Sequence, residues 1–299
     1  MIPVAFDPIY VLPLPENHRF PMEKYDLLHR QLIHEGTCEP KDFFSPATVD
    51  YDSVVAIHQK VYVQRLKDLQ LNKTEIRKIG FPISKQLIDR EFIIAGGTLT
   101  GSLKALKDGI AFNIAGGTHH AFSSHGEAFC LLNDQAIAAQ YLLEKELAKR
   151  ILIIDLDVHQ GNGTAEIFRN EDRVFTFSMH GKKNYPFKKE KSDLDIDLED
   201  KTNDKTYINI IKEVLPKLLK NIDPDFIFYL SGVDILKSDR LGRLWVSIEG
   251  CKERDQIVLK YCHDMGIPVQ CSMGGGYSKD IKLIIEAHAN TYRTAKKIY

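Results

Sequence analysis

Residues 150–164 constrain the fold more than any other stretch of the chain, and they read Arg-Ile-Leu-Ile-Ile-Asp-Leu-Asp-Val-His-Gln-Gly-Asn-Gly-Thr. A hydrophobic run of strand length leads into Asp155, Asp157 and His159, spaced two residues apart, and then into two glycines. Continued as a strand, this spacing places the three polar side chains on one side. Buried charges are costly unless a cation lies among them, so the pattern predicts a divalent metal such as zinc. The alternative is an acidic strand end that forms salt bridges or caps the next helix.

Beyond residue 84, segments of strand character alternate with segments of helical character. The expected helices span residues 84–107, 133–149, 206–221 and 248–265, with a closing helix from about residue 280. The expected strands span residues 110–115, 151–156, 173–179, 226–230 and 267–272. Pro216 is expected to kink or shorten its helix. This alternation is typical of βαβ units and predicts an α/β fold with a mainly parallel sheet that helices cover on both faces.

Residues 1–83 are less regular than the rest of the chain. They begin with a proline-rich stretch and are expected to form two or three short helices that wrap the sheet and build part of the rim of the site. A length of 299 residues allows one large domain or two ordinary ones, and no internal repeat or obvious linker divides the chain.

The composition predicts a soluble protein of the cytoplasm. Hydrophobic residues make up 43% of the chain, enough for a substantial core, and the formal net charge of −1 predicts no bulk attraction to nucleic acid. No apolar run is long enough to span a membrane, and the N-terminus lacks the basic and apolar regions of a secretion signal, so no membrane partner is expected. The scattered cysteines favour reduced thiols over a disulfide framework or a zinc ribbon: Cys38, Cys130, Cys251, Cys262 and Cys271.

Chemically reactive side chains follow five of the predicted strands. They lie in the segments Gly116-Gly117-Thr118-His119-His120, Asp157-Val158-His159, Ser178-Met179-His180, Ser231-Gly232-Val233-Asp234 and Met273-Gly274-Gly275-Gly276-Tyr277. Because ligands bind beyond the carboxyl ends of the strands in open parallel sheets, the five segments predict one site. A hydrolytic zinc site needs three protein ligands and one open position, and Asp157, His159 and Asp234 are the candidate ligands. On its own, Asp234 would be interpreted as a capping residue in a glycine turn.

Two adjacent histidines are candidates for proton transfer. Adjacent histidines are more often structural, but Asp155 offers a carboxylate partner and Asn162 an amide oxygen for the pair His119 and His120. One histidine can then take a proton from water and return it to a leaving amine. Tyr277 follows three glycines and is a candidate donor to a developing oxyanion, with a core tyrosine as the alternative.

Five motifs together resemble the zinc-dependent histone deacetylase family. They are Gly116-Gly117-Thr118-His119-His120, Ala128-Phe129-Cys130-Leu131-Leu132-Asn133-Asp134, Asp155-Leu156-Asp157-Val158-His159-Gln160-Gly161-Asn162-Gly163, Gly232-Val233-Asp234 and Gly275-Gly276-Tyr277. Residues 13–25 resemble the bacterial members, whereas Gln160, Asn162 and the stretch 239–242 resemble the class IV-like branch. The resemblance implies the arginase/deacetylase fold, with a single catalytic domain over residues 1–299 around a mainly parallel sheet of about eight strands.

The resemblance also implies roles for individual residues. The implied zinc ligands are Asp157, His159 and Asp234. The implied catalytic residues are His119 with its partner Asp155, His120 with its partner Asn162, and Tyr277; of these, His120 is the general base and acid, and Tyr277 polarises the acyl carbonyl. The implied potassium site comprises Asp155, main-chain oxygens of Asp157 and His159, and Ser178 with Met179. The predicted walls of the substrate tunnel are Phe129, Gly117, Gly275, Gly276 and Tyr185, with Phe187 as an alternative to Tyr185.

The activity that the resemblance implies is zinc-dependent removal of acetyl or longer acyl groups from the ε-amine of lysine in proteins or peptides. Three alternatives stay open: an amidohydrolase acting on acetylpolyamines, a catalytically silent acyl-lysine-binding module, and arginase-type manganese chemistry. The lysine-rich stretch 182–191 is interpreted as a solvated loop. A basic rim there would suit polyamines or histone tails poorly unless its lysines face away.

Overall fold

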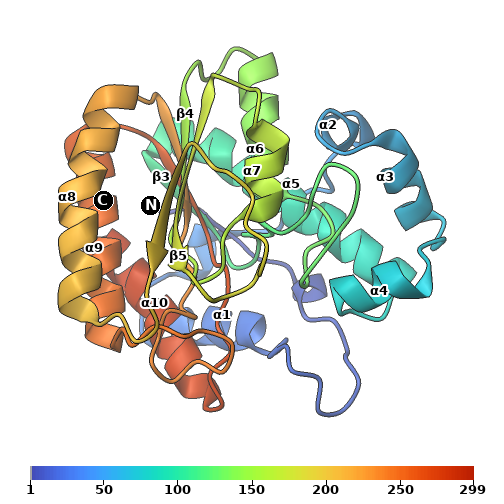
Figure 1. Cartoon of the computed structure of the whole chain (residues 1–299), viewed down its shortest axis with the longest axis horizontal. Coiled ribbons are helices and arrows are strands. Elements are labelled where there is room, and N and C mark those ends of the chain that lie inside the picture. The colour runs from blue at the N-terminus through green and yellow to red at the C-terminus, as the bar shows by residue number, and fades with distance from the viewer. Residues whose placement is uncertain (1) are drawn as a thin grey trace.

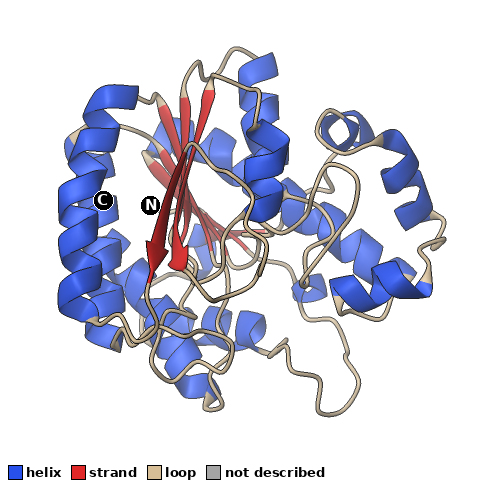
Figure 2. Ribbon diagram, viewed as in Figure 1, coloured by secondary structure: helices blue, strands red, loops and turns tan. Residues whose placement is uncertain are grey.

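Eight parallel strands form one sheet through the centre of the protein (Figures 1 and 2). The computed structural model describes residues 2–299 and gives the strand order β2-β1-β3-β8-β7-β4-β5-β6. The strands are β1 (Val4–Ala5), β2 (Phe43–Phe44), β3 (Ile110–Asn113), β4 (Ile151–Asp155), β5 (Val174–Gly181), β6 (Leu194–Leu198), β7 (Phe226–Leu230) and β8 (Val269–Ser272). The predicted α/β class is therefore confirmed, with an entirely parallel sheet.

Helices cover both faces of this sheet. They are α1 (Lys24–His34), α2 (Tyr51–Val55), α3 (Lys60–Lys67), α4 (Lys73–Ile79), α5 (Lys85–Asp108), α6 (Asp134–Glu144), α7 (Asn162–Phe168), α8 (Asp204–Ile222), α9 (Ile248–Asp264) and α10 (Ile281–Ile298). One layer contains α8, α9, α10 and α1, each packed on the next, and the other contains α5 and α6 (Figure 1). Strands β3, β4, β7 and β8 are buried along their whole length between these layers, as a parallel sheet covered on both faces requires.

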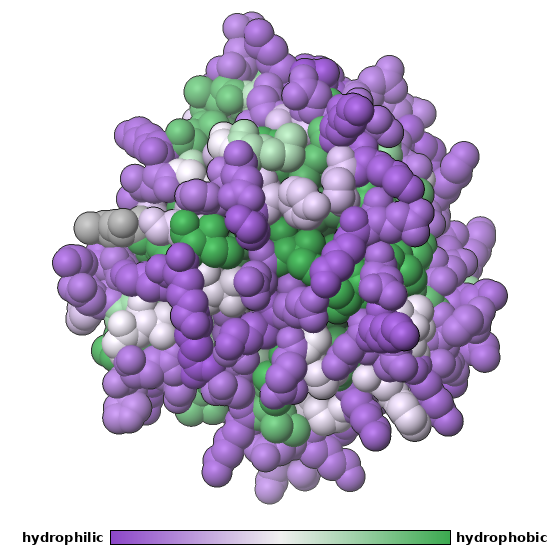
Figure 3. Space-filling view, turned by 90° about the vertical axis from the view of Figure 1, so that its left-hand side faces the viewer, coloured by the Kyte–Doolittle hydropathy of each residue, from purple (hydrophilic) through white to green (hydrophobic). Residues whose placement is uncertain are grey.

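The outer surface of the α8–α9 layer is largely hydrophilic. Figure 3 shows this face, with polar side chains over most of it and hydrophobic residues exposed in separate groups. The apolar residues of α8 instead point inward, where Ile211, Leu215 and Leu219 are buried. No helix within residues 2–299 combines the length and the apolar character that crossing a lipid bilayer would need.

Most elements predicted beyond residue 84 lie within a few residues of their expected positions, with two differences. The helix expected over 133–149 ends at Glu144, because Glu146 adopts a left-handed backbone conformation with φ 54° and turns the chain. Pro216 does not end its helix, which runs from Asp204 to Ile222. The carbonyl that Pro216 leaves without a helical partner belongs to Lys212, an exposed residue, so water can satisfy it.

Several elements were not predicted from the sequence. Residues 2–83 contain four α-helices and the two-residue strands β1 and β2, where two or three short helices were expected. Strand β6 was also missed, although its sequence Leu-Asp-Ile-Asp-Leu alternates with the period of a strand. Strand β4 ends at Asp155, so Asp157 and His159 lie in the loop that follows and do not continue the strand as expected.

A buried arginine on α9 supports the loops beyond β4 and β7. The Arg254 guanidinium is fully buried and donates to the carbonyl oxygens of Leu156 (3.3 Å), Ser231 (3.1 Å) and Gly232 (2.6 Å). Its Nε donates to the Asp255 carboxylate at 2.9 Å, which neutralises the charge. The three carbonyls lie just before two of the predicted metal ligands, so one side chain fixes both loops.

Replacing Arg254 by methionine is expected to lower the free energy of unfolding by about 3–5 kcal/mol, because the change removes the counter-charge of the buried Asp255 carboxylate and the hydrogen bonds from Arg254 to three buried carbonyls. Urea denaturation of the wild-type protein and the variant measures this difference. The matched control is Arg173→Met, which removes an exposed pair with Glu171 and is expected to cost less than about 1 kcal/mol. Equal losses in the two variants would contradict the supporting role of Arg254.

Candidate active site

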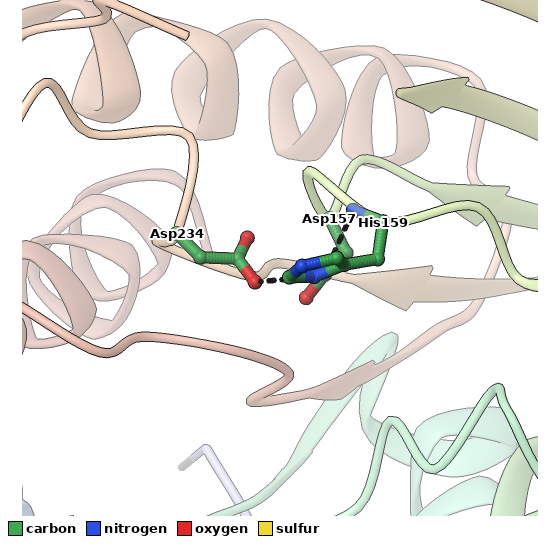
Figure 4. Close-up of side chains that lie close together, drawn as sticks. All are labelled: Asp157, His159 and Asp234. Carbon is green, nitrogen blue, oxygen red and sulfur yellow. Dashed lines mark hydrogen bonds and ion pairs between the residues drawn. The ribbon is translucent and has the colours of Figure 1, made fainter. Parts of the chain in front are cut away.

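Asp157, His159 and Asp234 converge at the carboxyl end of the sheet (Figure 4). All three are buried, and one ligand atom from each lies within 4.8 Å of the others. His159 Nδ1 lies 3.1 Å from Asp157 Oδ1 and 3.1 Å from Asp234 Oδ2. Two ligand atoms bound at about 2.0 Å to one tetrahedral ion would lie about 3.3 Å apart. The donor set and its spacing therefore fit a zinc ion.

Backbone amides orient both carboxylates of this triad. The Val158 amide donates to Asp234 Oδ1 at 2.9 Å, and the Gly275 amide donates to Asp157 Oδ2 at 2.8 Å. In each case the other carboxylate oxygen faces His159. The first contact joins the loop after β4 to the loop after β7, so the three ligands are held together by main-chain hydrogen bonds.

Gly275 passes so close to the triad that no side chain fits there. A Cβ atom at this position would lie 2.0 Å from Asp234 Oδ2 and 2.8 Å from Asp157 Oδ2. Any residue other than glycine would thus fill the space where a cation would bind. This close approach explains why the glycine run precedes Tyr277.

The electrostatics of the triad favour a cation among its members. Burial and the charge of Asp157 raise the pKa of Asp234 to about 7. Burial by itself would lower the pKa of His159, but the two carboxylates outweigh it and raise that pKa to about 10. Positive charge at His159 is therefore strongly stabilised, and a divalent ion would satisfy the same two carboxylates more fully.

The two histidines that precede α6 have different partners, as the sequence predicted. His119 Nδ1 lies 2.7 Å from Asp155 Oδ2, and His120 Nδ1 lies 2.6 Å from Asn162 Oδ1. An amide oxygen can only accept, so Asn162 fixes the proton of His120 on Nδ1 and leaves Nε2 as an acceptor. Both imidazoles are buried, and their ring centroids lie 4.1 Å apart.

The pKa values of His119 and His120 are shifted in opposite directions. Burial opposes protonation of His119, but the adjacent Asp155 carboxylate outweighs it and raises the pKa of His119. Burial and the positive charges of His119 and His159 lower the pKa of His120 well below its ordinary value. Protonation is therefore favoured at His119 and opposed at His120, so His120 is the member of the pair more readily present as a neutral imidazole.

The backbone N–H and C=O of Tyr277 are both hydrogen-bonded, by the consecutive residues Asp239 and Arg240. Its amide donates to Asp239 Oδ2 at 2.6 Å, and its carbonyl oxygen accepts from Arg240 Nε at 2.9 Å. Asp239 Oδ1 also accepts from the amides of Leu241 and Gly242, so the loop after β7 anchors the tyrosine. The Tyr277 hydroxyl has no hydrogen-bond partner among residues 2–299, which leaves it free to donate to a ligand.

These side chains line one cavity of about 730 Å³. Its walls include the predicted tunnel residues Gly117, Phe129, Tyr185 and Gly275, together with the triad members Asp157 and His159 and with His119, His120 and Tyr277. Gly276 was expected in the tunnel but does not line the cavity, because it faces Val233 and Ile284 in the core behind it. Phe187, the alternative to Tyr185, lies at the outer edge and is 90% exposed.

Tyr185 is linked to another segment that lines the cavity. Its hydroxyl donates to Glu127, which lies two residues before Phe129, and its ring packs edge-on against His120 with 5.0 Å between centroids. Glu127 is also close to His125 and Lys78, and the contacts with His125 and Tyr185 hold its pKa down at about 2. The two segments are thus joined by a charged hydrogen bond.

The residues predicted for potassium lie on β4, on β5 and in the loop after β4: Asp155 ends β4, Ser178 and Met179 lie within β5, and Asp157 and His159 lie in the loop. Asp155 and Ser178 are register partners in the sheet, and Met179 follows in the same buried strand. Ser178 Oγ is 2.9 Å from His180 Nδ1, and Asp155 Oδ1 accepts from the Asp157 amide. Asp155 and Ser178, two of the predicted oxygen donors, are therefore neighbours in the sheet.

A buried histidine braces the loop that carries His119 and His120. His58 Nδ1 donates to the carbonyl oxygen of Phe122 at 2.9 Å, and its Nε2 accepts from the Asn133 amide at 3.0 Å. These partners require a neutral ring, and burial lowers the pKa of His58 to about 4. The loop between β3 and α6 is therefore tied to the segment between α2 and α3.

Lowering the pH from 7 to 5 is expected to remove about 2 kcal/mol of stability through His58 alone. The pKa in the folded state is below the ordinary value of 6.5, so the unfolded chain binds the proton first. This contribution is complete above pH 6.5, is lost as the pH falls toward 4, and changes no further below 4. Denaturation of the wild-type protein and of His58→Gln across this range measures it, with exposed His34→Gln as control. Parallel pH profiles for wild type and His58→Gln would contradict the prediction.

Sequence reasoning missed several side chains that support the site. Asp239 and Arg240, which hold Tyr277, were noted only as part of a motif, and Arg254 and Glu127 received no role. Lys24 is fully buried behind the Tyr277 loop and donates to the carbonyl oxygen of Gly274 at 3.2 Å; burial lowers its pKa to about 8. The partners of these side chains are far away in the sequence. The one available signal was the presence of a charged residue in a segment that is otherwise expected to be buried.

The fold is shared with a domain of known structure. The solved structure of the HDA15 HD domain superimposes on 99% of this chain, and on 88% of its own length, with a TM-score of 0.83 at 20% sequence identity. At that identity the likeness concerns the fold alone. It places the chain in the same class of α/β domains as the HDA15 HD domain.

Sequence comparison identifies the family. The model of the histone deacetylase domain matches residues 18–292, so the chain belongs to the histone deacetylase family. It is 43% identical over 297 residues to an uncharacterized protein of Picosynechococcus, covering 99% of both chains. It is 30% identical to acetoin utilization protein AcuC of Staphylococcus aureus, over 88% of this chain and 73% of that one. It is 28% identical to histone deacetylase 2 of Arabidopsis thaliana, over 90% and 72%.

Proposed function

We propose that this chain is a zinc-dependent hydrolase that removes acyl groups from the ε-amine of lysine in proteins or peptides. One observation carries the proposal: Asp157 and His159 of the buried Asp-His-Asp triad line the same cavity as a neutral imidazole with an unprotonated Nε2 and an unpartnered tyrosine hydroxyl. Zinc bound by Asp157, His159 and Asp234 would supply Lewis acidity, which polarises a carbonyl and favours water as a nucleophile at neutral pH.

The protein's own residues supply the proton transfers. His120 Nε2 takes a proton from the attacking water, because its Nδ1 proton is committed to Asn162. As the new bond to oxygen forms, the Tyr277 hydroxyl donates to the carbonyl oxygen on which negative charge develops. The proton on His120 then passes to the amine nitrogen as the carbon–nitrogen bond breaks, giving a carboxylic acid and a free amine.

The surrounding groups set the charge on these residues. Asp155 favours the cationic form of His119 beside His120, which favours a negatively charged transition state while His120 remains able to accept a proton. Phe129 and Tyr185, which both line the cavity, offer aromatic surfaces to the apolar stem of an acyl-lysine. We also propose a structural potassium ion near Asp155 and Ser178, and a cytoplasmic location, which agrees with five buried and unpaired cysteines.

Acyl release from a panel of substrates tests the proposal. Zinc-loaded protein and the His120→Ala variant are incubated with acetyl-lysine peptides, longer acyl-lysine peptides and acetylpolyamines, and the free acid is quantified. Hydrolysis of acyl-lysine peptides that disappears in the variant would support the proposal. Hydrolysis of acetylpolyamines alone would favour a small-molecule amidohydrolase. Bound zinc and bound peptide without turnover would indicate an acyl-lysine-binding module.

A further inference from the structure

The mouth of the cavity carries an excess of positive charge. Six basic side chains line the cavity, against two acidic ones: Arg19, Lys78, Arg90, Lys183, Arg240 and Arg243, with Glu127 and Asp157. Arg90 is buried, whereas the other five basic residues are exposed. Since Asp157 belongs to the buried triad, the exposed part of the cavity has five basic residues and one acid.

Three of these exposed basic residues already have carboxylate partners. Lys78 lies 3.5 Å from Glu127, and Asp200 pairs with both Arg243 at 2.8 Å and Lys183 at 3.8 Å. These pairs account for Glu127, the acid at the exposed part of the cavity. The two remaining exposed basic residues, Arg19 and Arg240, take part in none of these pairs.

Arg19 and Arg240 are the two groups without a carboxylate partner. Within residues 2–299, no carboxylate oxygen lies within 4.0 Å of either guanidinium. They are neighbours, because Arg240 Nη2 donates to the carbonyl oxygen of Arg19 at 3.2 Å. Arg240 also holds the Tyr277 carbonyl, and the Arg19 guanidinium carbon lies 5.0 Å from the ring centroid of Phe129. Arg240 is therefore beside Tyr277, the proposed donor to the acyl carbonyl, and Arg19 is beside Phe129, which would contact the stem of the acyl-lysine.

Two exposed guanidinium groups beside a binding cavity select for one kind of ligand charge. A guanidinium binds a carboxylate through paired, charge-assisted hydrogen bonds, and two of them repel an ammonium group. Because both lie at the entrance, the group that they bind belongs to the part of the substrate that stays outside the cavity. A histone tail or a polyamine would bring the wrong charge to this position.

On the basis of the proposed function, we propose that the substrate presents a carboxylate next to the acyl-lysine and that Arg19 and Arg240 bind it. This carboxylate comes from an acidic side chain of a peptide or from the α-carboxylate of an acyl-lysine at a free C-terminus. Both sources share the chemistry, and separate peptides distinguish them.

The test measures binding and turnover with four acetyl-lysine peptides of equal length. Three have blocked ends and glutamate, glutamine or lysine on both sides of the acetyl-lysine, and the fourth has neutral flanks and a free C-terminal carboxylate on the acetyl-lysine. Dissociation constants are measured with the zinc-loaded His120→Ala variant by fluorescence anisotropy, and kcat/KM with the active protein. Arg19→Gln and Arg19→Glu are the test variants. Arg77→Gln, an exposed arginine of α4 that does not line the cavity, is the matched control.

The expected result is a Kd about tenfold lower for a carboxylate-bearing peptide than for the glutamine-flanked peptide, weakening at high salt. The ratio falls toward one in Arg19→Gln, reverses in favour of lysine flanks in Arg19→Glu, and stays at its wild-type value in Arg77→Gln. Equal binding of all four peptides, or a preference that survives Arg19→Glu, would overturn the inference. Because binding is measured without turnover, an absence of hydrolysis would count against the proposed function alone.

Discussion

Replacing His120 by alanine is expected to lower kcat/KM by about 10²–10⁴-fold, the range that a positioned general base contributes. The structure gives the reason, because Asn162 fixes the Nδ1 proton and leaves Nε2 to accept the proton of water. Steady-state kinetics on the best substrate of the panel, together with metal analysis of the purified variant, measure the effect. The bound zinc is expected to be unchanged, since His120 is not one of the three candidate ligands.

The control for this loss is His34→Ala, which removes an exposed imidazole at the end of α1. It is expected to retain wild-type kinetics. A decrease in kcat/KM of less than tenfold in His120→Ala would contradict the role of His120 as the base and would make His119 the candidate. If the variant also lost its metal, the kinetic result would report on the site as a whole and not on proton transfer.

Replacing Asp234 by asparagine is expected to weaken zinc binding by more than about 100-fold, beyond the loss that changes around a ligand usually cause. The variant removes one of two carboxylates that face His159 Nδ1 while keeping the size of the side chain. Competition with a chromophoric chelator gives the affinity directly. Asp264→Asn, an exposed carboxylate on α9, is the matched control.

The same variant has a second expected effect: it weakens zinc binding but does not destabilise the metal-free protein. Without zinc, the buried Asp157 and Asp234 repel each other, so Asp234→Asn is expected to melt at the same temperature as the metal-free wild type or higher. Added zinc then raises the Tm of the wild type and leaves the variant unchanged. Two results would show that Asp234 is structural. One is a variant with a lower Tm than the metal-free wild type, and the other is a rise in Tm on adding zinc that equals the rise of the wild type.

The sequence predicted the centre of the site well for a physical reason. Asp157, His159, Asp234 and Tyr277 directly follow buried strands or glycine turns, so their positions depend on local patterns and on the common edge of a parallel sheet. The central strands were found for the same reason, since a run such as Phe226–Leu230 is apolar along its whole length.

What could not be predicted depends on contacts between distant parts of the chain. Arg254 meets the Leu156 carbonyl 98 residues away, and Tyr185 meets Glu127 across 58 residues. No local pattern specifies such pairs. The early end of α6 depends on the backbone of Glu146, and the two-residue strands β1 and β2 are too short to show any periodicity.

The contact between Arg240 and the Tyr277 carbonyl has a consequence for how substrate preference can diverge among related chains. Arg240 supports the tyrosine and faces the entrance, so a change there alters the chemistry along with recognition. The Arg19 guanidinium lies over the Phe129 ring, and within residues 2–299 it donates no hydrogen bond to the backbone of the site. Relatives that adopt new substrates are therefore expected to vary at the position of Arg19 and to retain arginine at the position of Arg240.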